Sequence, residues 1–549
     1  MKDTNKTFFL FLLVLALIVN VAGINVNFFT DDPGLYAAIS KNLLWKKDFF
    51  ELFTYNRDWL DKPHFPFWAV LLSFKVFGVS VWAYRLPALL FFFLSLIYTW
   101  LFAKKYYGRD IAMIAVLVLA TALNIQMSNT DVRAEPYLMA LIMGSVYHIA
   151  SLYRRYSLKH LLLTALLTAC AIMTKGIFVI VAVYGAVLGQ MIFEKKLREI
   201  FRWKWLALAI LTILFTFPEL YALYTQFDLH PEKTVFERHN VSGIKWFLWD
   251  SQFGRFINSG PINRKASGSK FFYLHTLLWA FAPWCLLFYY AVFKNIKNII
   301  KHIALKEYYT LSGGLLLLML FSLSGFQLPF YTNAVFPLFA IITAPFCIEN
   351  LPKFGMRFRH VTFLLYAILL IAAVVIIDSL LKPSNYLLVT TIFAVLGFTN
   401  FFFKGLTDFH IRIFAVSCLV SLFAGCYLNV VFYNEITPYK GEIAAASYIN
   451  QKPFDKVDIY SLKFENNNFQ FYCKRPVKFL PIGQLGKFHP TKPSVFFASQ
   501  LSIDYLKQTH VDFKILKSFI TYPQENILPA FINKKTRQSV LGHVYLIYR

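Results

Sequence analysis

The chain has 549 residues, of which 58% are hydrophobic, 19% aromatic and only 15% charged. A soluble chain of this length needs more polar surface, so the composition excludes an ordinary globular enzyme and indicates an integral membrane protein. The formal net charge of +26 is also typical of nucleic-acid binding. However, most basic residues of the apolar part stand in short clusters between apolar runs, so we expect no nucleic-acid partner.

Apolar runs long enough to cross a bilayer, about 17–25 residues each, recur from Phe8 to Tyr433. The first run follows Lys2 and Lys6 and lacks a clear A-x-A cleavage site, which favours a retained signal anchor. We predict an all-α polytopic membrane protein with about thirteen transmembrane helices, at residues 8–27, 82–103, 110–128, 134–152, 160–174, 177–193, 205–223, 271–293, 308–325, 331–348, 361–379, 386–403 and 411–432.

Basic clusters fall on alternate loops between these spans, which places the N-terminus on the cytoplasmic side of the inner membrane. An odd number of spans then places the C-terminus on the periplasmic or extracellular side. The segments expected on that outer side are residues 28–81, 129–133, 224–270, 326–330 and 434–549. The apolar run Phe65–Val79 is short for a span and is predicted to be an interfacial or re-entrant helix.

The composition changes after residue 433, where charged residues become frequent. Short β-rich segments alternate there with helical patterns, which is typical of an α/β fold. We therefore divide the chain into a transmembrane domain, 1–433, and an extracytosolic α/β domain, 434–549. The predicted strands are Lys456–Ser461, Val495–Ala498 and Val544–Tyr548, and the predicted helices are Gly441–Asn450 and Ile503–Thr509.

Two carboxylates, Asp31 and Asp32, directly follow the first apolar run. Charged groups beside a membrane anchor are costly to hold unless they have a function. Asp32 has a structural explanation as well, because Asp32 followed by Pro33 is typical of an N-cap that opens a helix over residues 34–44. The residues alone leave both interpretations open.

A second charged group of the same loop contains Arg57, Asp61 and Lys62. Lys62 stands between an acid and an aromatic run near the membrane surface, where a cation attracts lipid phosphate. It is also explained as an ordinary solvated charge. Six cysteines occur without metal-ligand spacing, and we interpret them as small buried hydrophobic residues.

The short turn 129–133 places further charges on the outer side. Asp131 either pairs locally with Arg133 or serves a site, and Glu135 either complements the dipole of the helix that follows or serves the same site. Lys175 and Glu219 stand at the ends of predicted spans, where snorkelling to the interface is a sufficient explanation for both.

The long outer loop 224–270 combines aromatic and basic residues, among them Trp249 and Arg255. This composition fits an interfacial helix over a lipid phosphate. His239 has no partner at metal-ligand spacing and is interpreted as a surface histidine.

In this order, the charged segments resemble the bacterial polyprenyl-phosphate-sugar glycosyltransferases, the family of the lipid A aminoarabinose transferase and the protein O-mannosyltransferases. The resemblance runs from about residue 8 to residue 345. The matching motifs are Asp32…Tyr36-Ala37, Asp61-Lys62-Pro63, Phe67-Trp68, Phe77-Gly78, Arg85-Leu86-Pro87, Arg133 with Glu135, Thr174-Lys175-Gly176, Trp249…Arg255-Phe256 and Leu328-Pro329-Phe330-Tyr331.

The resemblance implies a GT-C fold and an inverting transfer of a sugar from a polyprenyl-phosphate donor. Asp32 would be the general base for the acceptor hydroxyl, and Glu135 would help to hold donor or acceptor. Lys62, Arg255 and Tyr331 would bind the donor phosphate and stabilise it as it leaves. The acceptor would be a lipid, such as lipid A, or a protein.

Further expectations follow from the same resemblance. No cofactor is required and no metal ligand is assigned, although a divalent metal is left open. Membrane lipids are expected partners beside the donor and the acceptor. The supporting residues of the site would be Asp31, Asp61, Arg57, Asp131 and Arg133.

Two other classes of protein compete with this hypothesis. A lipid-linked sugar transporter explains the number of spans, but it predicts ionisable residues near the bilayer midplane and two related halves. The acids of this chain cluster at the outer surface instead. A non-catalytic scaffold would leave the acidic turns unexplained, so the sequence favours the glycosyltransferase.

Overall fold

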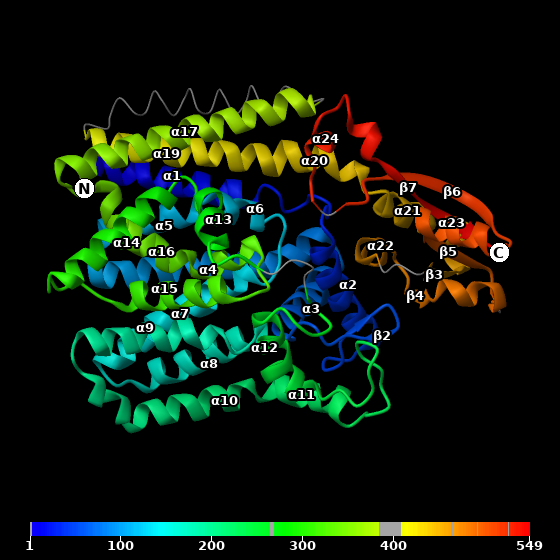
Figure 1. Cartoon of the computed structure of the whole chain (residues 1–549), viewed down its shortest axis with the longest axis horizontal. Coiled ribbons are helices and arrows are strands. Elements are labelled where there is room, and N and C mark those ends of the chain that lie inside the picture. Colours follow the sequence, from blue (N-terminus) through cyan, green and yellow to red (C-terminus); the bar gives the residue numbers. More distant parts are fainter. Residues whose placement is uncertain (1–2, 264–267, 384–407, 463–465, 491, 525) are drawn as a thin grey trace.

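The computed structural model describes residues 3–263, 268–383, 408–462, 466–490, 492–524 and 526–549. The described chain is mostly helical, and its long helices lie side by side in a bundle along the longest axis of the molecule (Figure 1). The long helices are α1 Asp3–Val21, α4 Val81–Tyr107, α5 Arg109–Ala120, α7 Glu135–Arg154, α8 Leu158–Lys175, α9 Val179–Phe193, α10 Trp203–Leu223, α14 Cys285–Ile300, α15 Tyr309–Leu323, α16 Phe336–Ile348, α17 Lys353–Leu381 and α19 Phe409–Cys426.

These helices agree with the predicted spans, with two interruptions. Predicted span 110–128 is divided into α5 and α6, Leu123–Ser128, and predicted span 271–293 into α13, Phe272–Ala280, and α14. Pro283 stands between α13 and α14 and lacks the backbone N–H that a continuous helix needs. Predicted span 386–403 lies outside the described residues.

Six described helical segments are long and apolar enough to cross a membrane: Val81–Tyr107, Leu158–Lys175, Trp203–Asp228, Pro329–Ile348, Lys353–Leu381 and Phe409–Tyr439. Several apolar helices of the described chain are shorter, such as Val179–Phe193 and Tyr309–Leu323. The chain is therefore a multi-pass membrane protein, and the count of thirteen spans stays a prediction.

Two helices illustrate how the bundle is organised. Helix α5 is buried on nearly all sides, as expected for a helix that is apolar around its whole circumference. Helix α17 instead leaves Leu364, Ile368 and Val375 more than half exposed. An exposed apolar face along a long helix is what contact with lipid chains requires, because lipid rather than water then surrounds it.

The residues after α20, Tyr433–Ile436, fold into a five-stranded sheet with helices, which we call the C-terminal region (residues 441–549). The strand order is β4-β3-β5-β7-β6; β3 pairs in parallel with β4 and β5, and β7 runs antiparallel to β5 and β6. The elements are α21 Gly441–Ile449, β3 Asp458–Leu462, α22 Asn467–Tyr472, β4 Val477–Leu480, β5 Ser494–Ser499, α23 Gln500–Gln508, β6 Lys514–Thr521, α24 Pro529–Ile532 and β7 Gly542–Tyr548.

The three predicted strand segments correspond to β3, β5 and β7, and the two predicted helices to α21 and α23. Strands β4 and β6 were not predicted. Strand β4 has only four residues, and β6 carries Lys514 and Lys517 among its apolar residues, which obscures the alternating pattern.

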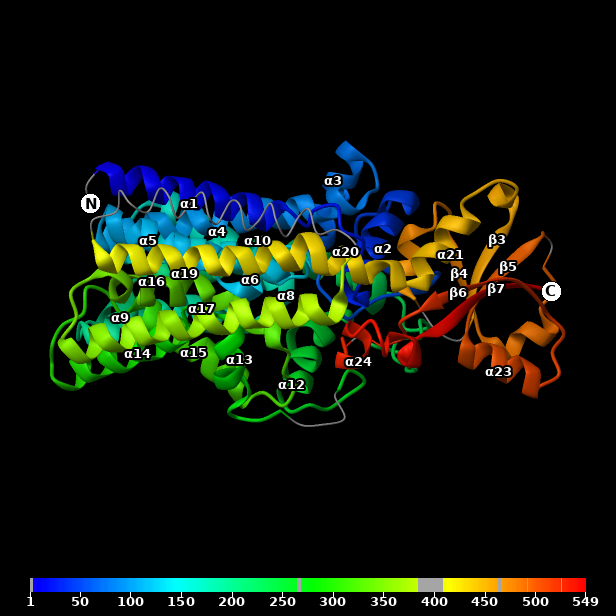
Figure 2. The same ribbon diagram turned by 90° about the horizontal axis from the view of Figure 1, so that it is seen from above.

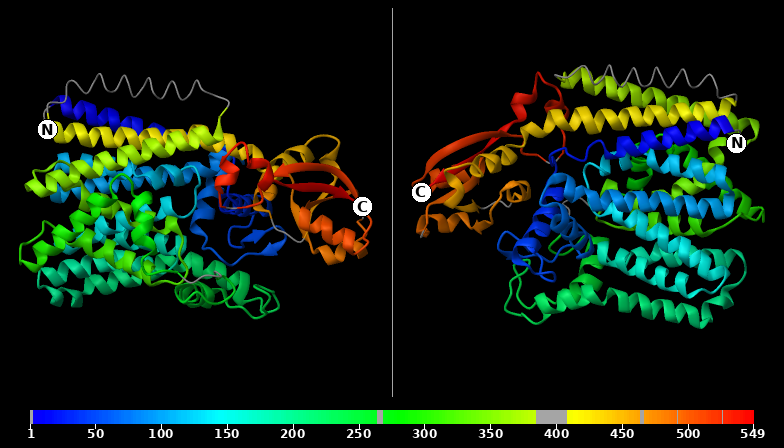
Figure 3. Two further views of the ribbon diagram at one scale, coloured as in Figure 1. Left: turned by 45° about the horizontal axis from the view of Figure 1, so that its top comes forward. Right: turned by 180° about the vertical axis from the view of Figure 1, so that it is seen from behind.

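Residues 28–81, which we call the first outer loop after their predicted side of the membrane, lie with the C-terminal region at one end of the bundle, and the N-terminus lies at the other end (Figures 1 and 2). The loop contains α2 Asp31–Lys46, the hairpin β1 Phe53–Thr54 with β2 Arg57–Asp58, and α3 Phe65–Phe77. Figure 3, seen from behind, shows α2 between the bundle and the C-terminal region. This shared end contains all the predicted outer charges that are considered below.

Candidate active site

Helix α2 begins at Asp31, and Thr30 is its N-cap residue in extended conformation. Of the two interpretations left open by the sequence, the structure excludes Asp32 as the N-cap, because Asp32 lies inside the first helical turn. The hydroxyl of Thr30 donates to Asp131 rather than capping α2. Pro33 falls in the first turn, where its missing N–H leaves no helical bond unmade.

Arg133 connects the first turn of α2 to the turn that precedes α7. Its guanidinium pairs with Asp32 at 2.6 Å and with Asp131 at 3.1 Å, and it stacks over the ring of Phe330 at 4.1 Å. Burial alone would lower the pKa of Arg133, but the carboxylates of Asp131 and Asp32 outweigh it and raise that pKa. The Asp32 side chain remains 48% exposed, so it is open to a further partner.

Asp61 holds two cations from separate parts of the chain. Lys62 pairs with it at 3.0 Å, and Arg255 of α12, Ser251–Phe256, pairs with its other oxygen. Burial would raise the pKa of Asp61, but Lys62 and Arg255 hold that pKa below its usual value. The Nε atom of Arg255 is buried with no hydrogen-bond partner among the described residues, which leaves one donor for a ligand.

A third cation, Lys175, lies at the C-terminal end of α8 and pairs with Glu135 at the start of α7. Its ammonium group lies 3.8 Å from the centre of the Tyr331 ring, a cation–π contact. Snorkelling is therefore not needed to explain Lys175, which sequence reasoning left outside the site. The signal that could have found it is the motif Thr174-Lys175-Gly176.

Gly176 allows the outer loop to approach Lys175 closely. Its φ of +115° disfavours other residues, and a Cβ at this position would lie 2.3 Å from the side chain of Gln252. Gln252 belongs to α12, which also carries Arg255. Glycine at this turn is thus one local reason that the cations of α8 and α12 lie close together.

Glu219 of α10 is completely buried, so the prediction that it snorkels to the interface is wrong. It accepts hydrogen bonds from the backbone N–H and the Nδ1 atom of His64, both at 3.0 Å. Because His64 follows Lys62 by two residues, this buried pair fixes the segment that carries Lys62.

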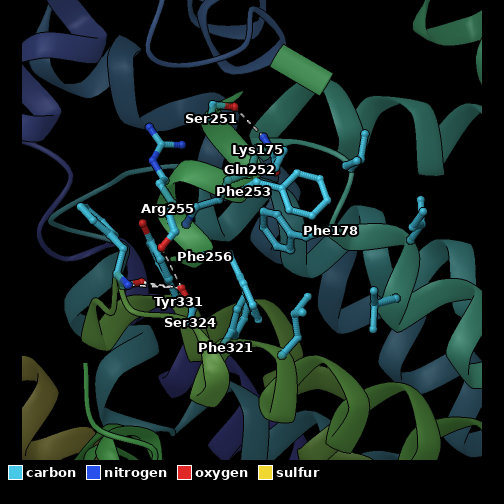
Figure 4. Close-up of a pocket in the computed structure, with 15 residues that line it drawn as sticks. Lys175, Phe178, Ser251, Gln252, Phe253, Arg255, Phe256, Phe321, Ser324 and Tyr331 are labelled. Atoms are coloured by element: carbon cyan, nitrogen blue, oxygen red, sulfur yellow. Dashed lines mark hydrogen bonds between the residues drawn. The ribbon is translucent and has the colours of Figure 1, made fainter. Parts of the chain in front are cut away.

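Two adjoining cavities meet at these cations. A small polar pocket is lined by Asp61, Lys62 and Glu219, and an apolar cavity of about 300 Å³ is lined largely by aromatic and aliphatic side chains. Lys175, Ser251, Gln252 and Arg255 line both cavities. Figure 4 shows Arg255 on one side of the apolar cavity and the ring of Phe178 on the other. The apolar lining consists of Ile177, Phe178, Ile180, Val181, Phe253, Phe256, Leu320, Phe321 and Phe326.

The carboxylates of the site gather around the buried ring of Tyr36. Burial raises the pKa of Tyr36, and the nearby Glu135, Asp32 and Asp61 raise it further. Tyr331 lines the apolar cavity beside Lys175. Within the described chain, no three His, Cys, Asp or Glu residues are grouped as metal ligands. The cationic side chains that line the cavities are Lys62, Lys175 and Arg255.

Two of the predicted supporting residues face elsewhere. Asp31 accepts hydrogen bonds from the backbone and side chain of Asn467 in the C-terminal region. Arg57 stacks over the ring of Phe479, at 3.8 Å. The other eight predicted residues lie in two networks. Asp61 pairs with Lys62 and Arg255. Ion pairs and ring contacts through Phe330 and Lys175 join Asp32, Asp131, Arg133, Glu135 and Tyr331.

The chain is similar in sequence to several known proteins. Residues 61–221 match the family described as dolichyl-phosphate-mannose-protein mannosyltransferase. An uncharacterized protein of Aquifex aeolicus is 22% identical over 475 residues, which are 85% of this chain and 87% of the relative. The undecaprenyl phosphate-alpha-4-amino-4-deoxy-L-arabinose arabinosyl transferase of Edwardsiella ictaluri is 25% identical over 319 residues, 57% of this chain and 54% of the relative.

Solved structures share the whole fold. ArnT of Cupriavidus metallidurans bound to undecaprenyl phosphate superposes with a TM-score of 0.76 at 15% identity, covering 98% of this chain and 97% of that one. Its apo form gives a TM-score of 0.72 at 16% identity, with 92% and 95% covered. The oligosaccharyltransferase of Archaeoglobus fulgidus gives 0.52 at 10% identity, with 96% and 72% covered.

The fold is that of the GT-C membrane enzymes. Together with the family match, it confirms the class predicted from the charged segments. The chain is a glycosyltransferase of the polyprenyl-phosphate-sugar class.

Proposed function

We propose that the protein transfers a sugar, with inversion, from a polyprenyl-phosphate donor to a lipid (lipid A-like) or protein hydroxyl at the outer face of the cytoplasmic membrane. The observation that carries this proposal is the position of Lys62, Lys175 and Arg255 where a polar pocket meets an apolar cavity. An anionic headgroup on a long apolar chain fits that combination. The undecaprenyl phosphate bound to ArnT of Cupriavidus metallidurans supports it.

The donor phosphate would lie against Lys62 and Arg255, and the first part of its polyprenyl chain would lie in the apolar cavity. Both cations are now paired with Asp61, so a bound phosphate would share their charge with this carboxylate. Preorganised cations of this kind stabilise the charge that develops on a leaving group, typically by a factor of about 10²–10³ per donor. Tyr331 would contribute through its contact with Lys175.

Asp32 would act as the general base. The acceptor oxygen would attack the anomeric carbon, the carbon–oxygen bond to phosphate would break with its electron pair leaving on the phosphate, and the hydroxyl proton would pass to Asp32. A single displacement of this kind inverts the anomeric configuration. Arg133 contacts the Oδ2 atom of Asp32, and Oδ1 has no hydrogen bond to a described residue, which leaves it for the acceptor.

Glu135 would have two effects in this arrangement. Its ion pair with Lys175 fixes the ammonium group at the boundary of the two cavities. Its carboxylate would also help to hold donor or acceptor. Because Glu135 is buried, removing it would leave Lys175 without its counter-charge, and an unpaired buried charge is strongly unfavourable.

The deciding experiment measures transfer from a radiolabelled polyprenyl-phosphate sugar in membranes. Asp32→Asn should abolish transfer while the protein keeps its thermal stability, because the amide cannot accept the proton. Asp504→Asn, at a partly exposed position of α23 where the side chain contacts Gln500 of the same helix, is the matched control and should retain full activity. Transfer by Asp32→Asn at the rate of the unaltered protein would remove Asp32 from the mechanism, and lack of transfer by the unaltered protein with every such donor would contradict the proposed function.

A further inference from the structure

Helix α22 of the C-terminal region lies along the first turns of α2. At its start, the backbone N–H and the side-chain amide of Asn467 donate to Asp31 at 3.1 and 2.5 Å. At its end, Lys41 donates to three backbone carbonyls, of residues 470, 471 and 473, at 2.5 to 2.9 Å. One helix of the outer loop thus holds both ends of one helix of the C-terminal region.

The charges match the dipole of α22. A carboxylate near a helix N-terminus and an ammonium group near its C-terminus are the favourable placements. Helix α22 has six residues, and helices this short are marginal without tertiary contacts. The position of α22 therefore depends on α2, and by the same contacts the start of α2 depends on α22.

The proposed catalysis uses neither of these two charged residues. Lys41 is 1% exposed and has no carboxylate in contact among the described residues. Burial lowers the pKa of Lys41 to about 7, and burial raises the pKa of Asp31 to about 6. Charges held at this cost, and outside the site, require another role.

Contacts with α22 flank Asp32 on both sides. The carbonyl of Thr30 accepts from the Asn468 side chain at 3.3 Å, and Asp31 is held by Asn467. On the other side, a Cβ at Gly34 would lie 2.3 Å from the Asn468 side chain, so glycine permits this close approach. The turn that carries Asp32 is thus held from the C-terminal region.

We infer that α22 positions Asp32 for the proposed reaction, with Asn467 acting through Asp31 and the C-terminal region serving as a part of the catalytic assembly. This inference rests on the proposed function of Asp32. The donor cations of the site make no contact with α22 in the described structure. Loss of the α22 contacts should therefore affect the reaction step and leave donor binding unchanged.

The kinetic test compares Asn467→Ala with the unaltered protein. Displacement of a catalytic group by about 1 Å can cost about 10²-fold in rate, so we expect kcat to fall about 10-fold to 100-fold with an unchanged KM for the donor. Lys478→Ala, which removes an exposed ion pair with Asp458 in the same region, is the matched control and should change neither. Gly34→Ala, which displaces Asn468 while keeping Asn467, should reproduce the fall in kcat.

A charge variant separates positioning from a general loss of structure. Asn467→Asp places a second carboxylate against Asp31, and the charged groups that already act on Asp31 are Asp32 of its own helix and Glu442 of α21. Two facing carboxylates cannot both ionise cheaply. We expect kcat of Asn467→Asp to be low at neutral pH and to recover toward pH 5, where the pair shares one proton. A low kcat at all pH values would contradict the inference.

Hydrogen exchange separates this inference from the proposed function. The backbone amides of residues 35–37 should exchange faster in Asn467→Ala than in the unaltered protein or in Lys478→Ala, whether or not any donor is turned over. If the unaltered protein transfers no sugar, the proposed function fails while faster exchange still shows that α22 holds this turn. Unchanged exchange, or faster exchange with an unchanged kcat, would overturn the inference.

Discussion

The first outer loop has two faces that use similar residues in different ways. On the face toward the cavities, Asp32 and Lys62 pair with side chains of opposite charge, Arg133 and Asp61. On the face toward the C-terminal region, the partners of Asp31 and Lys41 are the peptide groups of α22 and the side-chain amide of Asn467.

The two faces differ in whether a ligand can replace the partner of a charged side chain. An ion pair between side chains that lines a cavity can open to admit a phosphate or a hydroxyl. The entering group then takes over a contact that one member of the pair made to the other. Peptide groups of a packed helix cannot be replaced in this way. Asp32 is 48% exposed and Lys62 is 22% exposed, whereas Lys41 is 1% exposed. The first face is suited to chemistry and the second to assembly.

The largest effect is expected on the face toward the cavities. Arg255→Ala removes a preorganised donor to the leaving phosphate and should lower kcat about 10²-fold to 10³-fold, or about 3–4 kcal/mol in the transition state. Initial rates of transfer measure it. The control is Arg238→Ala, which changes an exposed arginine of the loop 224–270 that also contains Arg255. Its kcat should stay within about twofold of that of the unaltered protein. An unchanged kcat in Arg255→Ala would show that the pair with Asp61 is only structural.

Much of the cavity face could be predicted from the sequence, because its residues lie in short motifs. Asp32, Lys62 and Arg255 were recognised from their spacing and their resemblance to a family. The apolar runs were equally informative, since a helix in lipid requires a long apolar segment. What the motifs do not encode is the set of pairs that the fold makes among them.

Two errors at the candidate site have one physical cause, which is pairing between distant residues. Local rules accept Asp32 as a helix cap, but the helix begins one residue earlier, at Asp31, and Asp32 pairs with Arg133 of a distant turn. Glu219 was expected at the interface, yet it is buried against His64, 155 positions away. Such partners cannot be read from the neighbouring sequence.

The second-largest effect concerns the face of the first outer loop that contacts the C-terminal region. It is the dependence of the free energy of unfolding on pH. Because burial lowers the pKa of Lys41 to about 7 in the folded protein, the unfolded chain binds more protons between pH 7 and about 10.5. Stability should therefore rise with pH in this window, by about 2 kcal/mol between pH 7 and 9. Asp31, with its pKa raised to about 6, gives the opposite slope below pH 6 and does not interfere.

Lys41→Met removes the titrating group and should remove that rise. Thermal unfolding of the detergent-solubilised protein at pH 7, 8 and 9 measures it, with Lys478→Met as the control because Lys478 is an exposed lysine of the same region. If the stability of Lys41→Met rises with pH as steeply as that of the unaltered protein, burial does not lower the pKa of Lys41.

The smallest effect is expected on the face toward the cavities. It shows whether Lys62 binds the same donor phosphate as Arg255 and Lys175. Lys62→Ala should raise the donor KM about tenfold, because one charge-assisted hydrogen bond to phosphate is lost, with a smaller change in kcat. Arg255 and Lys175 remain at the boundary of the two cavities to hold the phosphate. Lys75→Ala, in helix α3 with its ammonium group over Phe49, is the matched control. If the donor KM stays constant in Lys62→Ala, Lys62 does not bind the donor phosphate. Arg255 would then bind the phosphate without Lys62.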